Sequence, residues 1–269
     1  MATERRQRAD ARSFTHVGRA LLDVLQILGE ATRLFADTLA VVRFAPRDRD
    51  RIAVQIVRIG TDALAMGALL SLFVGMTMVI QTADQLRDVS QTVLGPIVGI
   101  TMTKELGPVL MGFLLAGRAG SAMAAEIGAM VVYDEVNALR TMDIDPVRFL
   151  CLPRFLAATL TLPVLSLYSD FIGVAGGAAV VAVDPVIKIS VHEYLARMLE
   201  WVHFQDLAIG FLKAFVFGAV VSIVPCTFGL RTRGGTQGVA VSTTAAVVWS
   251  FILILVLDFL IVRACVVIT

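Results

Sequence analysis

Charged residues are scarce in this chain of 269 residues: they make up 17% of it, while 57% is hydrophobic. Soluble domains carry about 25% charged residues. The mean hydropathy is +0.82. Apolar runs recur at lengths near the ~20 residues that a helix needs to cross a bilayer, without the alternation that barrel strands show. The sequence therefore predicts an all-α integral membrane protein.

Motifs for nucleotide hydrolysis, metal binding and nucleophilic catalysis are also missing. No G-x-x-x-x-G-K-[ST] loop occurs, and the comparable glycines at 234–238 lack the lysine that would reach phosphates. The three histidines do not cluster, and no H-E-x-x-H or G-x-S-x-G motif is present. The three cysteines have no metal-ligand spacing. We expect no catalytic residue, metal site or cofactor in this chain, and no nucleic acid among its partners.

Arginines crowd the first 58 residues, and the positive-inside rule places this region in the cytoplasm. From Val17 to Val42, apolar residues follow helical spacing and polar residues share the opposite face, which is typical of a helix lying on a membrane. A helix docked on another protein is the alternative. A polar break with Pro46 follows. Residues 1–51 are predicted to form a cytoplasmic basic arm and an interfacial helix, without a cleavable signal peptide.

Residues 52–269 are predicted to form one transmembrane domain with five spanning helices. Their expected bounds are about 52–81, 93–130, 149–183, 207–230 and 239–268. Five crossings from a cytoplasmic N-terminus leave the C-terminus outside. An odd count also disfavours a transporter built from two equal inverted halves.

Glycine and proline interrupt two of these spans. Gly95-Pro96 and Gly107-Pro108 predict a broken or kinked helix in the first half of the second span. Pro153, Pro163 and the GVAGG sequence at 173–177 predict a bent, closely packed third span.

Small residues recur at every fourth position of the second span. Because helices in lipid associate by close backbone approach, this spacing predicts a buried helix packed tightly on its neighbours. One row is Gly112, Ala116, Gly120, Ala124 and Gly128, and a second row beside it is Gly117, Ser121, Ala125 and Ala129.

Ionisable residues within membrane spans are costly and usually face a partner or a cavity. Arg118 and Glu126 lie among small residues toward the cytoplasmic end of the second span, so we expect them to fix helices against each other. Asp258 stands alone in an apolar run, and we expect it to bond a neighbouring helix.

The longest polar segment between two spans reads YDEVNALRTMDIDPVR, residues 133–148, and a cytoplasmic helical segment is expected at about 133–146. It has helical character up to Met142 and a turn signal at Asp145-Pro146. Glu135 to Ala138, followed by Leu152-Pro153, resembles the EAA loop of ABC-transporter permeases, the helix that inserts into a cleft of the partner ATPase. The glycine normal in that loop is absent, since Thr141-Met142 occupies the region. A solvated loop is the alternative.

A longer resemblance covers most of the chain beyond the N-terminal arm. The strings ELGPVLMGFLLAGRAGSAMAAEIGAM and DEVNALRTMDIDPVRFLCLPRFLAATLTLPVL, with FVGMTMVIQ at 73–81 and LDF at 257–259, resemble the MlaE family of permeases. The resemblance implies a homodimer in the bacterial inner membrane, each copy with an interfacial helix and five spans. It also implies a dimer of cytoplasmic ABC ATPases, a ring of MCE-domain subunits on the outer side, and phospholipid as cargo.

The resemblance also implies roles for individual residues. In the family a lipid cavity opens outward at the dimer interface, lined largely by the first two spans. The lipid-binding residues it implies here are Leu69, Leu72, Phe73, Met76, Ile80, Lys104 and Glu105. For the apolar five the alternative is core packing or contact with bulk lipid, and for Lys104 and Glu105 it is a structural ion pair. The implied ATPase-coupling residues are Glu135, Asn137, Leu139, Met142, Asp145 and Pro146.

The function expected from this resemblance is that of a non-enzymatic permease subunit. It would move phospholipids or related lipids between the inner and outer membranes with an MCE-domain partner, as in outer-membrane lipid asymmetry, driven by a separate ATPase. A membrane scaffold that anchors a lipid-binding shuttle without moving is the alternative. Lipid-stimulated ATP hydrolysis by the assembled complex distinguishes the two.

Overall fold

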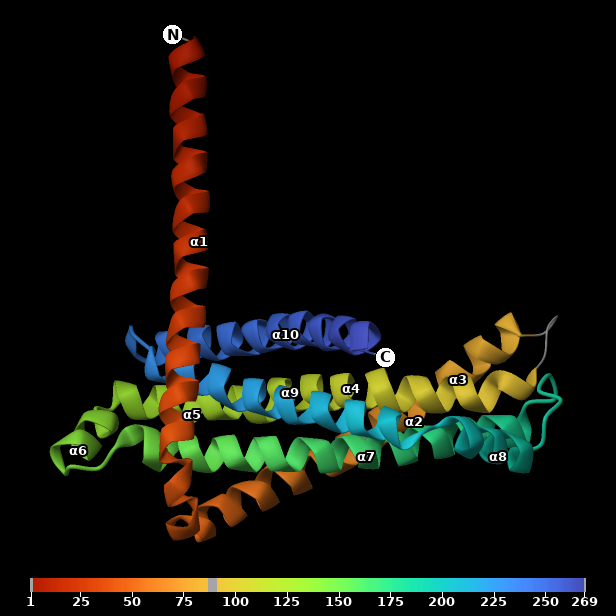
Figure 1. The fold of residues 1–269 in the computed structure, drawn as a ribbon. Coiled ribbons are helices and arrows are strands. Elements are labelled where there is room, and N and C mark those ends of the chain that lie inside the picture. The colour runs from red at the N-terminus through yellow and green to blue at the C-terminus, as the bar shows by residue number, and fades with distance from the viewer. Residues whose placement is uncertain (1, 87–90, 269) are drawn as a thin grey trace.

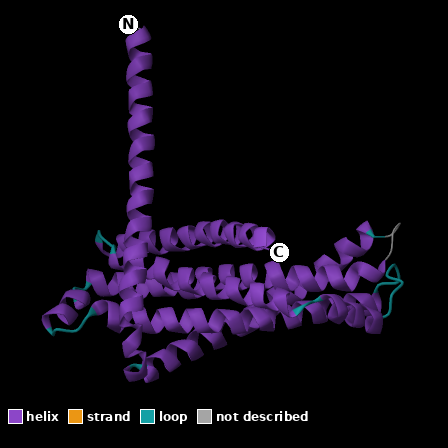
Figure 2. Ribbon diagram, in the orientation of Figure 1, coloured by secondary structure: helices purple, strands orange, loops and turns teal. Residues whose placement is uncertain are grey.

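The computed structural model describes residues 2–86 and 91–268, which are helical with short connections and contain no strand (Figure 2). The elements are α1 (Ala2–Val41), η1 (Val42–Arg47), α2 (Arg49–Gln85), η2 (Gln91–Val93), α3 (Leu94–Thr101), η3 (Met102–Leu106), α4 (Gly107–Leu115), η4 (Ala116–Gly120), α5 (Ser121–Val132), α6 (Glu135–Thr141), η5 (Val147–Cys151), α7 (Leu152–Val183), α8 (Val191–Trp201), α9 (Phe204–Leu230) and α10 (Gly235–Ile268).

Within the described residues, five helical stretches are long and apolar enough to cross a membrane. They are Arg49–Gln85, Gln91–Val132, Val147–Val183, Phe204–Leu230 and Gly235–Cys265. The prediction of an all-α membrane protein with five spans is therefore confirmed, with several spans beginning a few residues earlier than expected. The division into an arm of residues 1–51 and a domain of residues 52–269 stays a prediction.

The spanning helices form a bundle in which α7 packs chiefly on α2 and α9 (Figure 1). The most apolar window of the α7 span is 78% buried, whereas that of α10 is 17% buried. The bundle has two distinct ends in Figure 1: α6 and the start of α2 lie at one end, and α3 and α8 lie at the other. We call these the α6 end and the α8 end. Helix α1 projects from the α6 half at a steep angle.

Helices α2 and α7 pack backbone against backbone. A Cβ atom added to Gly176 would lie 2.6 Å from the carbonyl oxygen of Leu72, so only glycine fits at this approach. The hydroxyls of Ser71 and Ser169 are hydrogen-bonded at 2.6 Å across the same interface. The close packing predicted from the GVAGG sequence is confirmed, and α7 runs as one helix through Pro163.

The second span is interrupted as predicted, but by π-helical turns rather than by a break. The first turn, η3, ends where Gly107-Pro108 begins. Pro108 has no N–H to donate to the carbonyl four residues earlier, which removes one bond of the α-helical ladder there. A second π-helical turn, η4, contains Arg118. It was not predicted, because its sequence contains no proline.

The first row of small residues is buried, and it faces α9 and α10. A Cβ atom on Gly120 would lie 3.1 Å from Cγ of Pro225, and one on Gly128 would lie 2.8 Å from Oγ1 of Thr232. The second row is partly exposed, with Gly117 open at the surface. Tight packing is thus confirmed for the first row, while the second row is only partly buried.

Candidate functional site

The polar segment at the α6 end forms a short helix that is docked on the bundle. Val136 and Leu139 are buried, and they pack with Leu34 of α1 and Leu150 of η5. Asp134 precedes the helix with a φ of 62°, a left-handed conformation that allows the sharp turn out of α5.

The predicted coupling residues of this segment divide into two groups. Glu135, Asn137, Asp145 and Met142 are exposed, Met142 by 61%, and Pro146 is half-buried. Asn137 donates to Oδ1 of Asp134 at 2.7 Å, and Oδ1 of Asp145 accepts from the backbone N–H of Val147 at 3.0 Å.

Leu139 differs, because its side chain is only 8% exposed and anchors the helix to its own chain. A partner at the α6 end would therefore meet the exposed residues, while Leu139 holds them in place. Their contact with an ATPase stays a prediction.

An apolar groove of about 610 Å³ runs along the second half of α2. Leu69 and Phe73, both predicted to bind lipid, line it and are 58% and 62% exposed. The remaining lining residues are Met66, Leu70, Val74, Thr77, Met78, Gln81 and, from η3, Leu106.

The other predicted apolar residues do not line this groove. Leu72 faces Gly176 of α7, Met76 is half-buried, and Ile80 is exposed beside the groove. The lining residues follow the i, i+3, i+4 spacing of one helix face. That spacing, extended from Phe73, includes Met66 and Leu70, and it also includes Met76 and Ile80, which the groove lining does not.

Lys104 and Glu105 face α9 rather than each other. Nζ of Lys104 lies 2.6 Å from Oδ1 of Asp206, and Oε2 of Glu105 lies 2.6 Å from Nζ of Lys213. Adjacent helical residues point in different directions, so the two side chains do not meet. Each of them therefore forms a structural ion pair, which is the alternative considered above, but with a residue of α9. A role in lipid binding stays a prediction.

Lys213 is the centre of a charge network that the sequence analysis did not single out. Its side chain is fully buried and also lies 2.9 Å from Oδ1 of Asp258 on α10. Asp258 thus contacts a neighbouring helix. The available signal was a single lysine in the apolar α9 span, where an unpaired charge is costly. Through Lys213, the η3 turn is joined to both α9 and α10.

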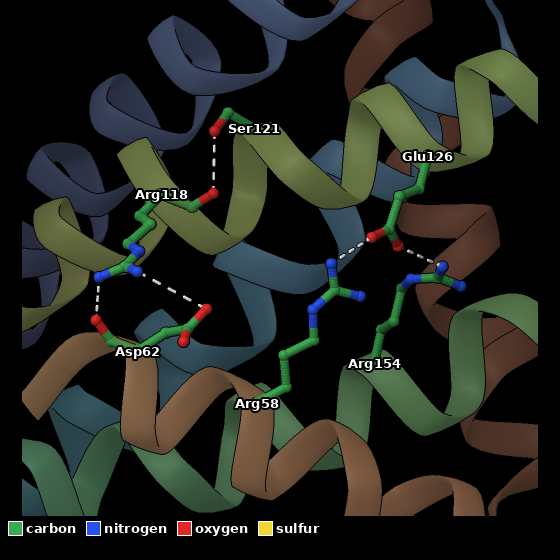
Figure 3. Close-up of polar contacts among 6 residues, drawn as sticks. All are labelled: Arg58, Asp62, Arg118, Ser121, Glu126 and Arg154. Carbon is green, nitrogen blue, oxygen red and sulfur yellow. Dashed lines mark hydrogen bonds and ion pairs between the residues drawn. The ribbon is translucent and has the colours of Figure 1, made fainter.

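A second charge cluster joins α2, the η4–α5 stretch and α7 (Figure 3). Oε1 of Glu126 lies 2.7 Å from a nitrogen of Arg58 on α2, and Oε2 lies 2.9 Å from a nitrogen of Arg154 on α7. Arg118 of η4 donates to the backbone carbonyl of Asp62 on α2 and lies 3.7 Å from its carboxylate. Glu126 and Arg118 therefore each connect the second span to α2, and Glu126 also connects it to α7.

Among residues 2–86 and 91–268, no group of three or more His, Cys, Asp or Glu residues could hold a metal ion. Cys151 and Cys226 are free and buried. What the described arrangement offers is an apolar groove, two charge networks that join helices, and an exposed docked helix at one end.

The chain matches the family model described as Permease MlaE over residues 52–264. It is 34% identical over 255 residues to a probable ABC transporter permease protein of Rickettsia typhi, covering 90% of this chain and 97% of the relative. It is 32% identical over 247 residues to the intermembrane phospholipid transport system permease protein MlaE of Haemophilus influenzae, covering 91% and 94%. It is also 35% identical over 206 residues to the chloroplastic protein trigalactosyldiacylglycerol 1 of Arabidopsis thaliana, covering 76% and 58%.

Proposed function

The chain belongs to the MlaE permease family, and from this premise we propose that it moves phospholipids between membranes as the membrane subunit of an ABC transporter. The Haemophilus relative is named as a phospholipid transport permease. ATP is hydrolysed by a separate partner chain, and this chain binds no cofactor of its own.

The observation that carries the lipid assignment is the groove on α2. Its lining is almost entirely apolar, and Met66 and Met78 add thioether side chains that adapt to irregular shapes. A volume of about 610 Å³ falls within the usual range of ~300–1,000 Å³ for ligand pockets. Acyl chains are mobile and carry no polar groups, so such a surface suits them. Lipid seated here would contact Leu69 and Phe73.

The coupling that we propose runs from α6 to the groove through the second and third spans. An ATPase dimer bound at the α6 end would move the exposed residues Glu135, Asn137 and Met142 when it closes on ATP. The docked Leu139 and the tight packing of α5 on α9 would carry that movement as a rigid unit. The π-helical turns η3 and η4 are where the second span would change shape. Narrowing of the groove would then displace lipid.

The assembly that we propose has a second copy of this chain, two cytoplasmic ATPases and an MCE-domain ring on the outer side. The N-terminus and the α6 end lie in the cytoplasm of a bacterial cell, and the α8 end and the C-terminus face the periplasm. Support for this orientation is the arginine-rich start of the chain.

The test is ATP hydrolysis and lipid transfer by the assembled complex in vesicles that contain phospholipid. A permease couples the two, so lipid should stimulate hydrolysis, and Phe73→Asp should lower both lipid transfer and this stimulation. Phe171→Asp is the matched control, since Phe171 is 75% exposed on α7 and lies outside the groove. A non-moving scaffold would give hydrolysis independent of lipid, and that outcome would refute the proposal.

A further inference from the structure

A small charged cavity lies between α2 and the η4–α5 stretch, on the α6 side of the apolar groove. Its volume is about 130 Å³, and Arg58, Asp62, Arg118 and Glu126 all line it. The rest of the lining is Gln55, Ile59, Ala63, Leu115, Ala119, Ala122 and Met123. About 10–15 Å³ of such volume holds one water, so this space accommodates a group of several heavy atoms but not an acyl chain.

The charge cluster at the cavity, which also includes Arg154 just outside its lining, has one more positive than negative charge. Arg58 and Arg154 share the single carboxylate of Glu126, and Arg118 is matched by Asp62. Three guanidinium groups and two carboxylates sum to +1. A phosphodiester carries one negative charge, so it would neutralise the cluster.

The two arginines that line the cavity retain unused donors. A guanidinium has five N–H donors. Within the described residues, Arg58 contacts Glu126, and Arg118 contacts the carbonyl and, at 3.7 Å, the carboxylate of Asp62. Arg58 reaches from α2 toward α5, and Arg118 reaches from η4 back toward α2 (Figure 3). Arginine forks of this kind match the oxygens of a phosphate.

The cavity and the apolar groove lie on one continuous face of α2. Gln55, Ile59 and Asp62 line the cavity, and Met66, Leu69 and Phe73 follow in the groove at spacings of three or four residues. From Asp62 to Phe73 the helix rises about 16 Å, which is close to half of the ~30 Å hydrocarbon thickness of a bilayer. A ligand along this face would meet cations first and an apolar surface next.

We propose that the cavity binds the phosphate of a phospholipid headgroup from the leaflet at the α6 end, with the acyl chains lying along the groove. Arg58 and Arg118 donate to the phosphate oxygens. This inference rests on the proposed function, because it names the polar part of the lipid that the groove would hold. It adds a headgroup site to residues that otherwise only join helices.

The test is photo-cross-linking of the full-length chain in nanodiscs of phosphatidylglycerol labelled with ³²P in the headgroup phosphate. A benzophenone side chain replaces Gln55, which lines the cavity, or Leu212, which is 54% exposed on α9 away from it. We expect several-fold more label at position 55. Equal labelling at the two positions means annular lipid only, and it would overturn the proposal.

Variants in the Gln55 cross-linking background then identify the donors. Arg118→Gln and Arg58→Gln should each lower the labelling about tenfold, the loss expected for one charge-assisted hydrogen bond, whereas Arg118→Lys should retain most of it. Because these arginines also join helices, Ala122→Phe is a second variant that fills the cavity and leaves every charge in place. Ala122 is exposed, so the fold should tolerate it. Full labelling in Ala122→Phe, or in Arg118→Gln, refutes the site.

Two further measurements distinguish a lipid phosphate from free phosphate, and the headgroup site from the proposed transport function. Binding of inorganic phosphate to the lipid-free chain is measured by calorimetry. If phosphate binds and also abolishes the labelling, the cavity is a site for the free ion and the lipid assignment is wrong. Lipid transfer by the assembled complex is measured separately. Transfer without labelling at position 55 rejects the headgroup site alone, and labelling without transfer rejects the proposed function alone.

Discussion

Replacing Lys213 by methionine should strongly destabilise the protein. The change leaves the carboxylates of Glu105 and Asp258, now 2.6 and 2.9 Å from Nζ of Lys213, without their cation. Breaking a buried pair costs about 3–5 kcal/mol. Glu105 keeps 39% of its side chain exposed and can be hydrated, so the lower end, about 3 kcal/mol, applies. For a chain of this size that corresponds to a fall in Tm of roughly 6–12 °C.

The assay is thermal unfolding of the purified protein in detergent, with three variants measured side by side. The triple variant Lys213→Met, Glu105→Gln, Asp258→Asn removes all the charges and should recover most of the loss. Arg197→Met is the control, because the Arg197–Glu200 pair is 49% and 61% exposed and such pairs contribute under about 1 kcal/mol. A Lys213→Met protein as stable as wild type, or a triple variant as unstable as the single one, would refute this reasoning.

Four other substitutions test separate parts of the structure. Gly120→Leu should prevent assembly of a stable protein, since even a Cβ atom there lies 3.1 Å from Pro225; recovery of a monodisperse, active complex on size exclusion would contradict the packing argument. Leu139→Asp should lower the Tm by undocking α6, whereas Met142→Asp, at a position 61% exposed, should leave the Tm unchanged and weaken ATPase binding in a pull-down. Tyr194→Phe should be as stable as wild type or more stable, because the buried hydroxyl has no hydrogen-bond partner in the described residues. Burial raises the pKa of Tyr194 to about 12, above the ~10 of an unfolded tyrosine. Wild type should therefore lose stability as the pH rises above about 10, and the Phe variant should lose less.

Elements set by local pattern could be predicted from the sequence. Apolar runs indicated the five spans, small residues at every fourth position indicated that the second span packs tightly on its neighbours, and Gly107-Pro108 indicated the interruption of that span. Each of these signals acts within one helix, so periodicity and backbone chemistry are enough to find it.

The charge networks could not be predicted in the same way, because their partners come from different helices. Lys104 pairs with Asp206 and Glu105 with Lys213, both more than a hundred positions along the chain. Which residues pair depends on how each helix is oriented about its own axis, and the sequence of a single span does not reveal that orientation. It also decides that Leu69 and Phe73 line the groove while Leu72 faces α7.

The π-helical turn η3 adds one residue to the second span without changing how the flanking helices face their neighbours. Such a turn rotates by less per residue than an α-helix, so the extra residue is absorbed within the turn. Deleting one residue of Met102–Leu106 would let the ladder close as an α-helix with α3 in nearly its present rotation against α4. Gly99, which lies against Met198 and Val202, would stay packed on α8. A single-residue deletion in η3 should therefore disturb the pairs that Lys104 and Glu105 form with α9 and leave the α8 end in place.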